Sequence, residues 1–139
     1  AIIDCFERGN ALYIIGNGGS ATASSHFAAE FVNKYRKFRQ PLRAYALNDV
    51  AILTSIANDY GYEYVFSRQL AAYGRQGDLL LTLSTSGRSR NIKKAIAETT
   101  NLGIKVIDFP RQGRDVGEIQ NYQLKLMHQV CSEVENYYV

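Results

Sequence analysis

Two apolar segments of this chain each run directly into a loop rich in glycine and hydroxyl side chains, and a helical pattern follows each loop. Residues 11–16 lead into Gly16, Asn17, Gly18, Gly19 and Ser20, and residues 78–83 lead into Ser84, Thr85, Ser86, Gly87 and Ser89. A buried strand that passes through a tight turn into a helix is the unit of parallel α/β proteins. Its occurrence twice in 139 residues restricts the chain to that class.

Strand and helix patterns alternate along the rest of the chain. Further strands are predicted at 42–47 and 104–109, and helices at 20–35, after Asp49, at 62–73, at 88–100 and from 118 to the end, with a loop at 110–117. We expect one domain, residues 1–139, with a three-layer α/β/α fold and a parallel sheet of four to five strands. The opening residues are typical of the end of a helix, and the last helix follows a bare loop. An N-terminal helix and a segment near 109–111 are therefore expected to be missing.

Both loops are predicted anion sites. Glycines bring backbone N–H groups close to a ligand, and a helix N-terminus adds unpaired donors and partial positive charge. The hydroxyl groups of Ser84, Thr85, Ser86 and Ser89 suit a phosphate monoester. Simple turn and capping roles, with Ser89 as the helix cap and Ser86 supporting it, are the alternative.

The two histidines stand near polar partners. His26 and Glu30 are four residues apart, so both project from one face of a helix, which suits two ligands of one metal or an ordinary surface pair. His128 and Gln120 are eight residues apart, about 12 Å along a helix axis. They can reach one metal only from opposite ends, and otherwise they serve different places, or His128 packs in the core.

Three more polar residues have two interpretations. Asp49 follows a strand end, so it either caps the next helix or faces a ligand. Asn58 and Asp59 either stop that helix or contact sugar hydroxyl groups.

The composition excludes several classes of protein. The formal charge is only +3, and the densest basic stretch, residues 34–43, is typical of a solvated helix end rather than a nucleic-acid surface. No apolar run approaches the roughly 20 residues that span a membrane, and no signal peptide opens the chain. Cys5 and Cys131 form no paired motif, which indicates free thiols in the cytoplasm.

Four stretches closely resemble the phosphoheptose isomerases, which are SIS-domain enzymes. They are GNGGSATASSHFAAEFV, ALNDVAILTSIANDYGYEYVFSRQL, GRQGDLLLTLSTSGRS and the Gln120–His128 spacing. The resemblance implies interconversion of sedoheptulose 7-phosphate and D-glycero-D-manno-heptose 7-phosphate through an enediolate, for bacterial surface polysaccharides. It also implies a cytoplasmic homotetramer with active sites between subunits, and no organic cofactor, nucleic acid or membrane.

The same resemblance assigns roles to residues. Glu30 and His128 match the acid–base pair, and His26, Glu30, Gln120 and His128 match a Zn²⁺ set found in some members. The expected substrate-binding residues are Asn17, Gly18, Gly19, Ser20, Asp49, Asn58, Asp59, Ser84, Thr85, Ser86, Ser89 and Gln120.

The chain departs from the family at a few positions. Ala23 and Ser25 replace an Asp and a Gln that usually precede the histidine, and Arg88 replaces an Asn. Two alternatives are a non-catalytic relative that binds the bacterial replication initiator and a sugar-phosphate sensor. The relative lacks counterparts of Glu30 and His128 and reads STRG where this chain has STSG, so the residues present favour the enzyme.

Overall fold

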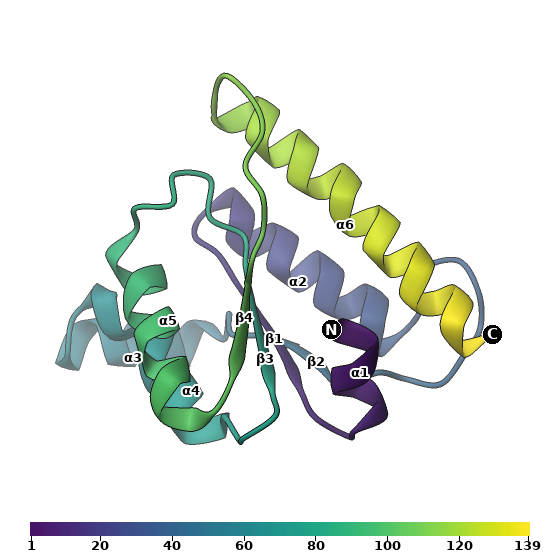
Figure 1. Cartoon of the computed structure of the whole chain (residues 1–139). Helices are drawn as coiled ribbons and strands as arrows, with labels where there is room; N and C mark the ends of the chain where they lie inside the picture. Colours follow the sequence, from purple (N-terminus) through teal and green to yellow (C-terminus); the bar gives the residue numbers. More distant parts are fainter.

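The computed structural model describes all of residues 1–139 as an α/β fold of three layers (Figure 1). In chain order the elements are α1 (Ile2–Glu7), β1 (Leu12–Ile15), α2 (Gly19–Val32), β2 (Ala44–Ala46), α3 (Val50–Asp59), the 3₁₀ turn η1 (Tyr62–Tyr64), α4 (Ser67–Tyr73), β3 (Leu79–Thr82), α5 (Arg90–Leu102), β4 (Lys105–Asp108) and α6 (Val116–Tyr138).

The sheet has four parallel strands in the order β2-β1-β3-β4. This confirms the predicted parallel sheet at the lower end of the expected strand number. The strand order reverses between β1 and β3, which pair directly from Leu12 with Leu79 to Ile15 with Thr82. Ligands of such sheets bind beyond the carboxyl ends of the strands at this reversal. Both predicted anion loops follow these two strands.

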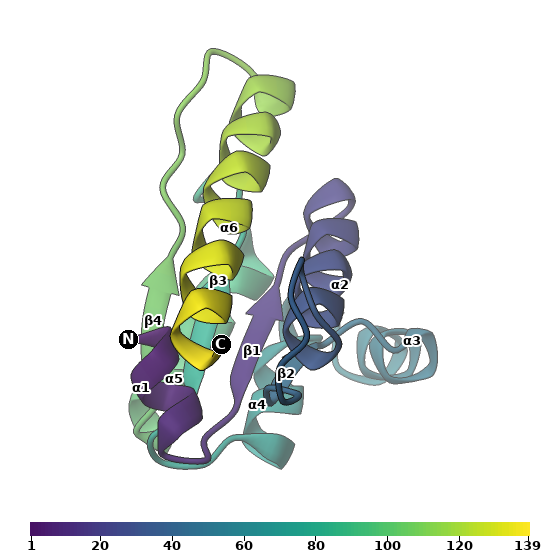
Figure 2. The ribbon, with the colours of Figure 1, turned by 90° about the vertical axis from the view of Figure 1, so that its right-hand side faces the viewer.

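Alternate residues of the strands face two separate cores, because successive side chains point to opposite faces of a sheet. Leu12, Ile14 and Leu81 pack under α1, α2 and α6, whereas Tyr13 and Leu80 pack under α3, α4 and α5. Figures 1 and 2 show the two helical layers on either side of the sheet. The central strands are buried on both faces, which explains their continuous apolar sequence.

Several predicted boundaries were wrong. The helix expected at 20–35 ends at Val32, and the helix expected at 62–73 divides into η1 and α4 around the buried Val65 and Phe66. The strand expected at 42–47 pairs only over Ala44–Ala46. The last helix begins at Val116, because Asp115 caps it by accepting a hydrogen bond from the Glu118 N–H.

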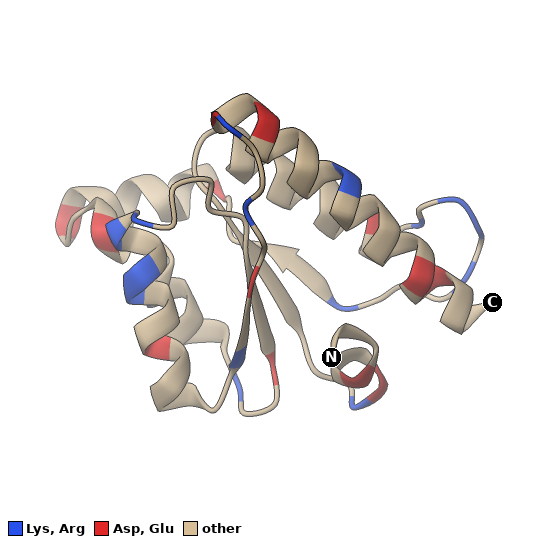
Figure 3. Cartoon of the chain, turned by 45° about the horizontal axis from the view of Figure 1, so that its top comes forward, with Lys and Arg blue, Asp and Glu red and all other residues tan.

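The basic stretch 34–43 is a loop between α2 and β2 that passes the C-terminal part of α6 (Figure 3). The predicted solvated helix end is wrong for Arg39, whose side chain is only 2% exposed. No helix of the chain combines the length and apolar character that crossing a bilayer requires. Cys5 and Cys131 are both free and buried, as expected.

Candidate functional site

The first predicted anion loop has the tight geometry that its glycines suggest. A Cβ at Gly16 would lie 2.6 Å from the Ser20 Cβ and 2.8 Å from the Ser20 backbone, so the strand can approach the helix only with glycine there. Gly18 has a positive φ of 57° and stands at the N-cap of α2. The Ser20 N–H closes the turn on the Asn17 carbonyl oxygen at 2.9 Å.

Asn17 joins this loop to the start of α5. Its Nδ2 donates to the Asn91 Oδ1 at 2.9 Å, and its Oδ1 accepts from the Asn91 Nδ2 and from the Tyr62 hydroxyl, both at 2.8 Å. Asn17 and Ser89 also line one hollow of about 580 Å³. The structure therefore brings the two predicted loops together, and the Asn17 amide is the link between them.

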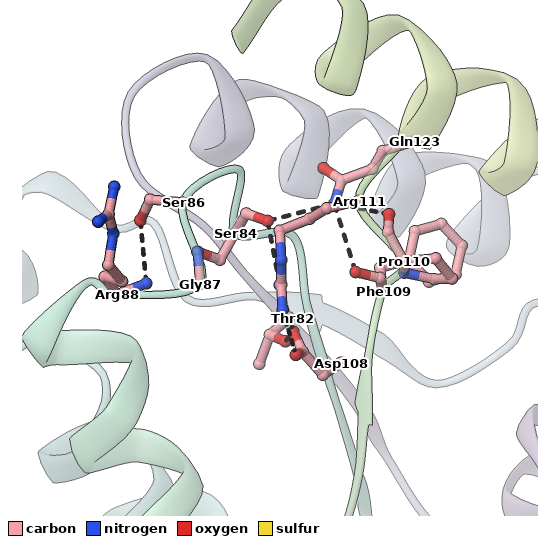
Figure 4. Close-up of polar contacts among 10 residues, drawn as sticks. All are labelled: Thr82, Ser84, Ser86, Gly87, Arg88, Asp108, Phe109, Pro110, Arg111 and Gln123. Carbon is pink, nitrogen blue, oxygen red and sulfur yellow. Dashed lines mark hydrogen bonds and ion pairs between the residues drawn. The ribbon is translucent and has the colours of Figure 1, made fainter. Parts of the chain in front are cut away.

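The second loop, residues 84–89, is folded by its own hydroxyl groups (Figure 4). The Ser84 Oγ accepts from the Gly87 N–H at 2.9 Å, and the Ser86 Oγ accepts from the Arg88 N–H at 3.0 Å. Ser89 is the N-cap of α5, as one interpretation of the sequence expected, but its side chain makes no capping bond. Because Ser84 and Ser86 act here as acceptors, their O–H groups stay available to donate to an anion.

His26, Glu30 and His128 form a compact cluster between α2 and α6. The Glu30 Oε1 lies 2.8 Å from the His26 Nε2 and 3.5 Å from the His128 Nε2. One ligand atom from each of the three residues lies within 4.8 Å of the others. The structure thus brings together the predicted catalytic pair, Glu30 and His128, and with His26 three of the four predicted metal ligands.

The environments of the three side chains differ. The Glu30 side chain is 13% exposed, His128 is 32% exposed and His26 is 48% exposed. The Glu30 Oε2 is buried without a hydrogen-bond partner. Burial, and then the Glu30 carboxylate, raise the pKa of the Cys131 thiol, so this neighbour stays protonated. A carboxylate between two imidazoles can exchange protons with a substrate or, with both rings neutral, hold a divalent metal.

Aromatic rings fix the position of His128. One sequence prediction placed this histidine in the core, and its side chain is half-buried. Tyr35 stacks on the His128 ring with centroids 5.4 Å apart and an interplanar angle of 18°, and Phe27 meets it edge-on at 5.5 Å. Tyr35 lies in the loop after α2, so this loop forms one wall of the cluster.

Glu135 of α6 holds that loop in place. Its carboxylate accepts from the backbone N–H groups of Tyr35, Arg36 and Lys37 at 2.6–2.8 Å and lies 3.3 Å from the Arg39 guanidinium. Burial alone would raise the pKa of Glu135, but these backbone donors and then Arg39 hold the pKa below its usual value. The carboxylate is therefore charged at neutral pH and anchors the loop that carries Tyr35.

Gln120 lies at the other end of the site. A Cβ at Gly19 would come within 2.7 Å of its Nε2, so Gln120 rests directly over the glycine loop. Gln120, Ser20 and His26 line a pocket of about 240 Å³. The eight-residue spacing thus places Gln120 at the first anion loop and His128 at Glu30, and His26 borders both places.

Three predicted site residues lie elsewhere in the chain. Asp49 caps α3 by accepting from the Ile52 N–H at 3.1 Å and lines a separate pocket of about 520 Å³ beside β2. Asn58 and Asp59 end α3, are exposed, and bond to each other at 3.0 Å. Within the single chain, these residues have the structural roles that the sequence offered as alternatives.

The sequence reasoning missed several residues beside the serine loop. The Gln123 side chain is buried and donates to the carbonyl oxygens of Ser84, Phe109 and Pro110. Arg111 forms a two-point ion pair with Asp108 and reaches the Ser84 carbonyl oxygen. Arg111 lies in residues 110–117, whose sequence pattern indicates only a loop, although the arginine there is a signal. Gln123 lies in the predicted last helix and belongs to no motif.

The sequence profile of the SIS domain family matches residues 1–109 of this chain. The chain is 38% identical to a phosphoheptose isomerase of Campylobacter concisus, covering 96% of this chain and 80% of the relative. It is 46% identical to one of Clostridium acetobutylicum, covering 87% and 61%. The alignment to the first relative spans 151 positions, more than the 139 residues here, so that relative carries residues without a counterpart in this chain.

Solved structures give the same result. The fold is similar to that of a phosphoheptose isomerase from Neisseria gonorrhoeae, with a TM-score of 0.90, 31% identity and coverage of 96% of this chain and 80% of that one. One from Francisella tularensis has a TM-score of 0.92, 30% identity and coverage of 97% and 81%.

Proposed function

The chain belongs to the phosphoheptose isomerases of the SIS domain family, and we propose that it interconverts sedoheptulose 7-phosphate and D-glycero-D-manno-heptose 7-phosphate. The observation that carries this proposal is the meeting of Glu30 with His26 and His128, of which His26 also lines the pocket at the first anion loop. A protein that only bound the sugar phosphate would need the loops but not this acid–base pair. The product belongs to heptose biosynthesis for surface polysaccharides.

The reaction moves one proton between neighbouring carbons and one between their oxygens. Glu30 takes the proton from C1 of the ketose and returns it to C2, passing through a cis-enediolate. His128 gives a proton to the oxygen on C2 and accepts the one on the C1 hydroxyl. The hydrogen bond from His26 to Glu30 orients the carboxylate, and stacking against Tyr35 fixes the His128 ring.

The loops bind and orient the substrate. Ser84, Thr85, Ser86 and Ser89 bind the phosphate, with Ser20 donating from the first loop. The remaining substrate-binding residues of the proposal are Asn17, Gly18, Gly19 and Gln120. Asp49, Asn58 and Asp59 lie apart from both loops within one chain, so the proposal includes them only for a site that is shared between subunits. Holding the phosphate fixes the distant reacting end, which turns remote binding energy toward catalysis.

The cluster fits a metal ion. Two imidazoles and a carboxylate are a donor set that zinc favours, and the buried Glu30 Oε2 has no partner within the chain. We propose that His26, Glu30, His128 and Gln120 hold Zn²⁺, which when bound supplies a Lewis acid near the substrate carbonyl. The metal set and the acid–base pair share Glu30 and His128, so neither residue serves both roles at the same time.

The proposal extends to assembly and location. His26 leaves one side of the cluster open, which suits a homotetramer whose active sites lie between subunits. Two free cysteines suit the reducing cytoplasm. We propose a single SIS domain over 1–139 that has a gap near 109–111 relative to the family. The family profile ending at Phe109 supports this gap.

The test is turnover of sedoheptulose 7-phosphate by the wild-type chain, Glu30→Gln and Glu133→Gln, with and without a chelator. Glu133 is an exposed glutamate of α6 and serves as the matched control. We expect Glu30→Gln to lower kcat by at least about 100-fold while phosphate binding persists, and the control to keep full activity. Retained turnover in Glu30→Gln would refute the assignment. Loss of turnover on chelation, restored by Zn²⁺, would support the metal.

A further inference from the structure

An arginine lies next to the serine loop, where the sequence predicted a phosphate site made of hydroxyl and backbone N–H groups without a charged side chain. The Arg111 Nη1 lies 3.4 Å from the Ser84 carbonyl oxygen. A Cβ at Gly87 would lie 3.0 Å from the Arg111 Cζ, 3.1 Å from its Nη2 and 3.2 Å from its Nε. The guanidinium therefore lies against the middle of the loop (Figure 4).

The position of the Arg111 guanidinium is fixed by Asp108 of β4. Its Nη1 and Nη2 donate to the two carboxylate oxygens of Asp108 at 3.0 and 2.9 Å, and the Thr82 hydroxyl donates to the Asp108 Oδ1 at 2.7 Å. Thr82 and Asp108 are paired partners in β3 and β4, so the support is part of the sheet itself. The arginine is thus oriented before any ligand arrives.

Counting donors shows which edge of the guanidinium is unused. Of its five N–H groups, three are engaged: two on Nη1, with Asp108 and Ser84, and one on Nη2. The Nε–H and the second Nη2–H have no partner in the chain, and they form one parallel pair. A Cβ at Gly87 would be almost equally far from the Cζ, Nη2 and Nε atoms, at 3.0 to 3.2 Å, so the serine loop packs against the face of the guanidinium and the free N–H pair extends from the edge of that covered face. Such a pair matches two oxygens of a phosphate.

The alternative is that Arg111 only braces the loop. A brace would use the contact with Ser84 and the ion pair but would not need an unused donor edge at the loop. The side chain is 30% exposed, so the edge is open to a ligand. Asp108 cancels most of the long-range field of Arg111, so binding would depend on short-range hydrogen bonds.

We propose that Arg111 is a phosphate-binding residue that grips two phosphate oxygens of the substrate, with Asp108 and Thr82 as its positioning residues. This inference rests on the proposed function, because it assumes that the serine loop holds the substrate phosphate. It assigns a charged side chain to a site for which the sequence predicted only uncharged hydroxyl and backbone N–H donors.

The test measures binding of inorganic phosphate to the full chain by titration calorimetry. We expect Arg111→Gln to weaken the phosphate Kd by about 10- to 100-fold, as loss of a two-point charge-assisted contact implies. Arg114→Gln is the matched control, because Arg114 is 91% exposed in the same segment and pairs only with Glu118. Its Kd should stay within about twofold of the wild type.

A second variant covers the case in which Arg111→Gln does not fold. Arg111→Lys keeps the charge beside Asp108 but has no planar donor edge, and we expect an intermediate Kd. Wild-type affinity in a folded Arg111→Gln or in Arg111→Lys would overturn the inference. Because binding is measured without turnover, the outcome is separate from the isomerase test: phosphate binding that needs Arg111 can stand even if sedoheptulose 7-phosphate is not converted.

Discussion

Replacing Glu135 with glutamine tests whether one buried carboxylate holds the wall of the catalytic cluster. Glu135 and Arg39 are each 2% exposed, so neither charge has water as an alternative partner. Glutamine keeps the shape but has one acceptor oxygen for three backbone N–H groups, and its amide directs a donor toward them. It also leaves the Arg39 charge buried without a counter-charge.

The magnitude follows from these two losses. An unpaired buried N–H costs about 1–3 kcal/mol, and breaking a buried ion pair from one side costs about 3–5 kcal/mol. The two overlap, because Arg39 can reorient, so we expect the free energy of unfolding to fall by about 3–5 kcal/mol. This is a large share of the roughly 5–15 kcal/mol that stabilises a typical domain.

The assay is urea unfolding followed by circular dichroism. With a denaturant slope of about 1–3 kcal/mol per molar, the midpoint should fall by roughly 1–5 M. Glu133→Gln, two residues away on the exposed face of α6, should change the free energy of unfolding by less than about 0.5 kcal/mol. A loss below about 1 kcal/mol in Glu135→Gln would refute the reasoning, because the carboxylate would then be replaceable by any polar group of its size.

Two further outcomes are expected. Gly16→Ala should lower the free energy of unfolding by about 1–3 kcal/mol and weaken phosphate binding, because its Cβ would lie 2.8 Å from the Ser20 backbone. An unchanged melting temperature would contradict the tight turn. The Asp78 carboxylate accepts four hydrogen bonds, and these outweigh burial and hold its pKa below its usual value. As the pH falls, the unfolded state therefore binds more protons at this residue than the folded state does. The contribution of Asp78 is complete at neutral pH and is lost below about pH 4. Asp78→Asn should therefore unfold more easily at pH 7 and lose less stability between pH 5 and 2, and acid titrations of parallel slope would contradict this.

The sequence predicted the fold because its apolar runs are local signals. Residues such as Leu80 and Leu81 are buried on both faces of the sheet, so no alternation obscured the strand. The helix boundary at Val32 could not be predicted, because Glu135, 100 residues from Tyr35 along the chain, binds the N–H groups that the helix would have used.

Part of the candidate site could be predicted because its signals, like the apolar runs of the strands, are local in the sequence. The His26–Glu30 pair follows from helical spacing, and the two loops follow from their glycines. The approach of His128 to Glu30, the stacking of Tyr35 and the reach of Arg111 depend on how α6 and the segment after β4 pack. Neither local propensity nor spacing carries that information, and only the family resemblance placed His128 beside Glu30.

The contact between α2 and α6, which brings His128 to Glu30, has a consequence for the synthesis of the chain. Ribosomes add about 5–20 residues per second, so Glu30 is made several seconds before His128, and Tyr35 is made as long before the Glu135 carboxylate that orders its loop. Until α6 emerges, one face of the sheet lacks the helix that covers it, because Met127, Cys131 and Val134 complete that core. Translation that stops before α6 therefore leaves the chain without a complete core, without the Gln123 support of the serine loop and without the partner of Glu30.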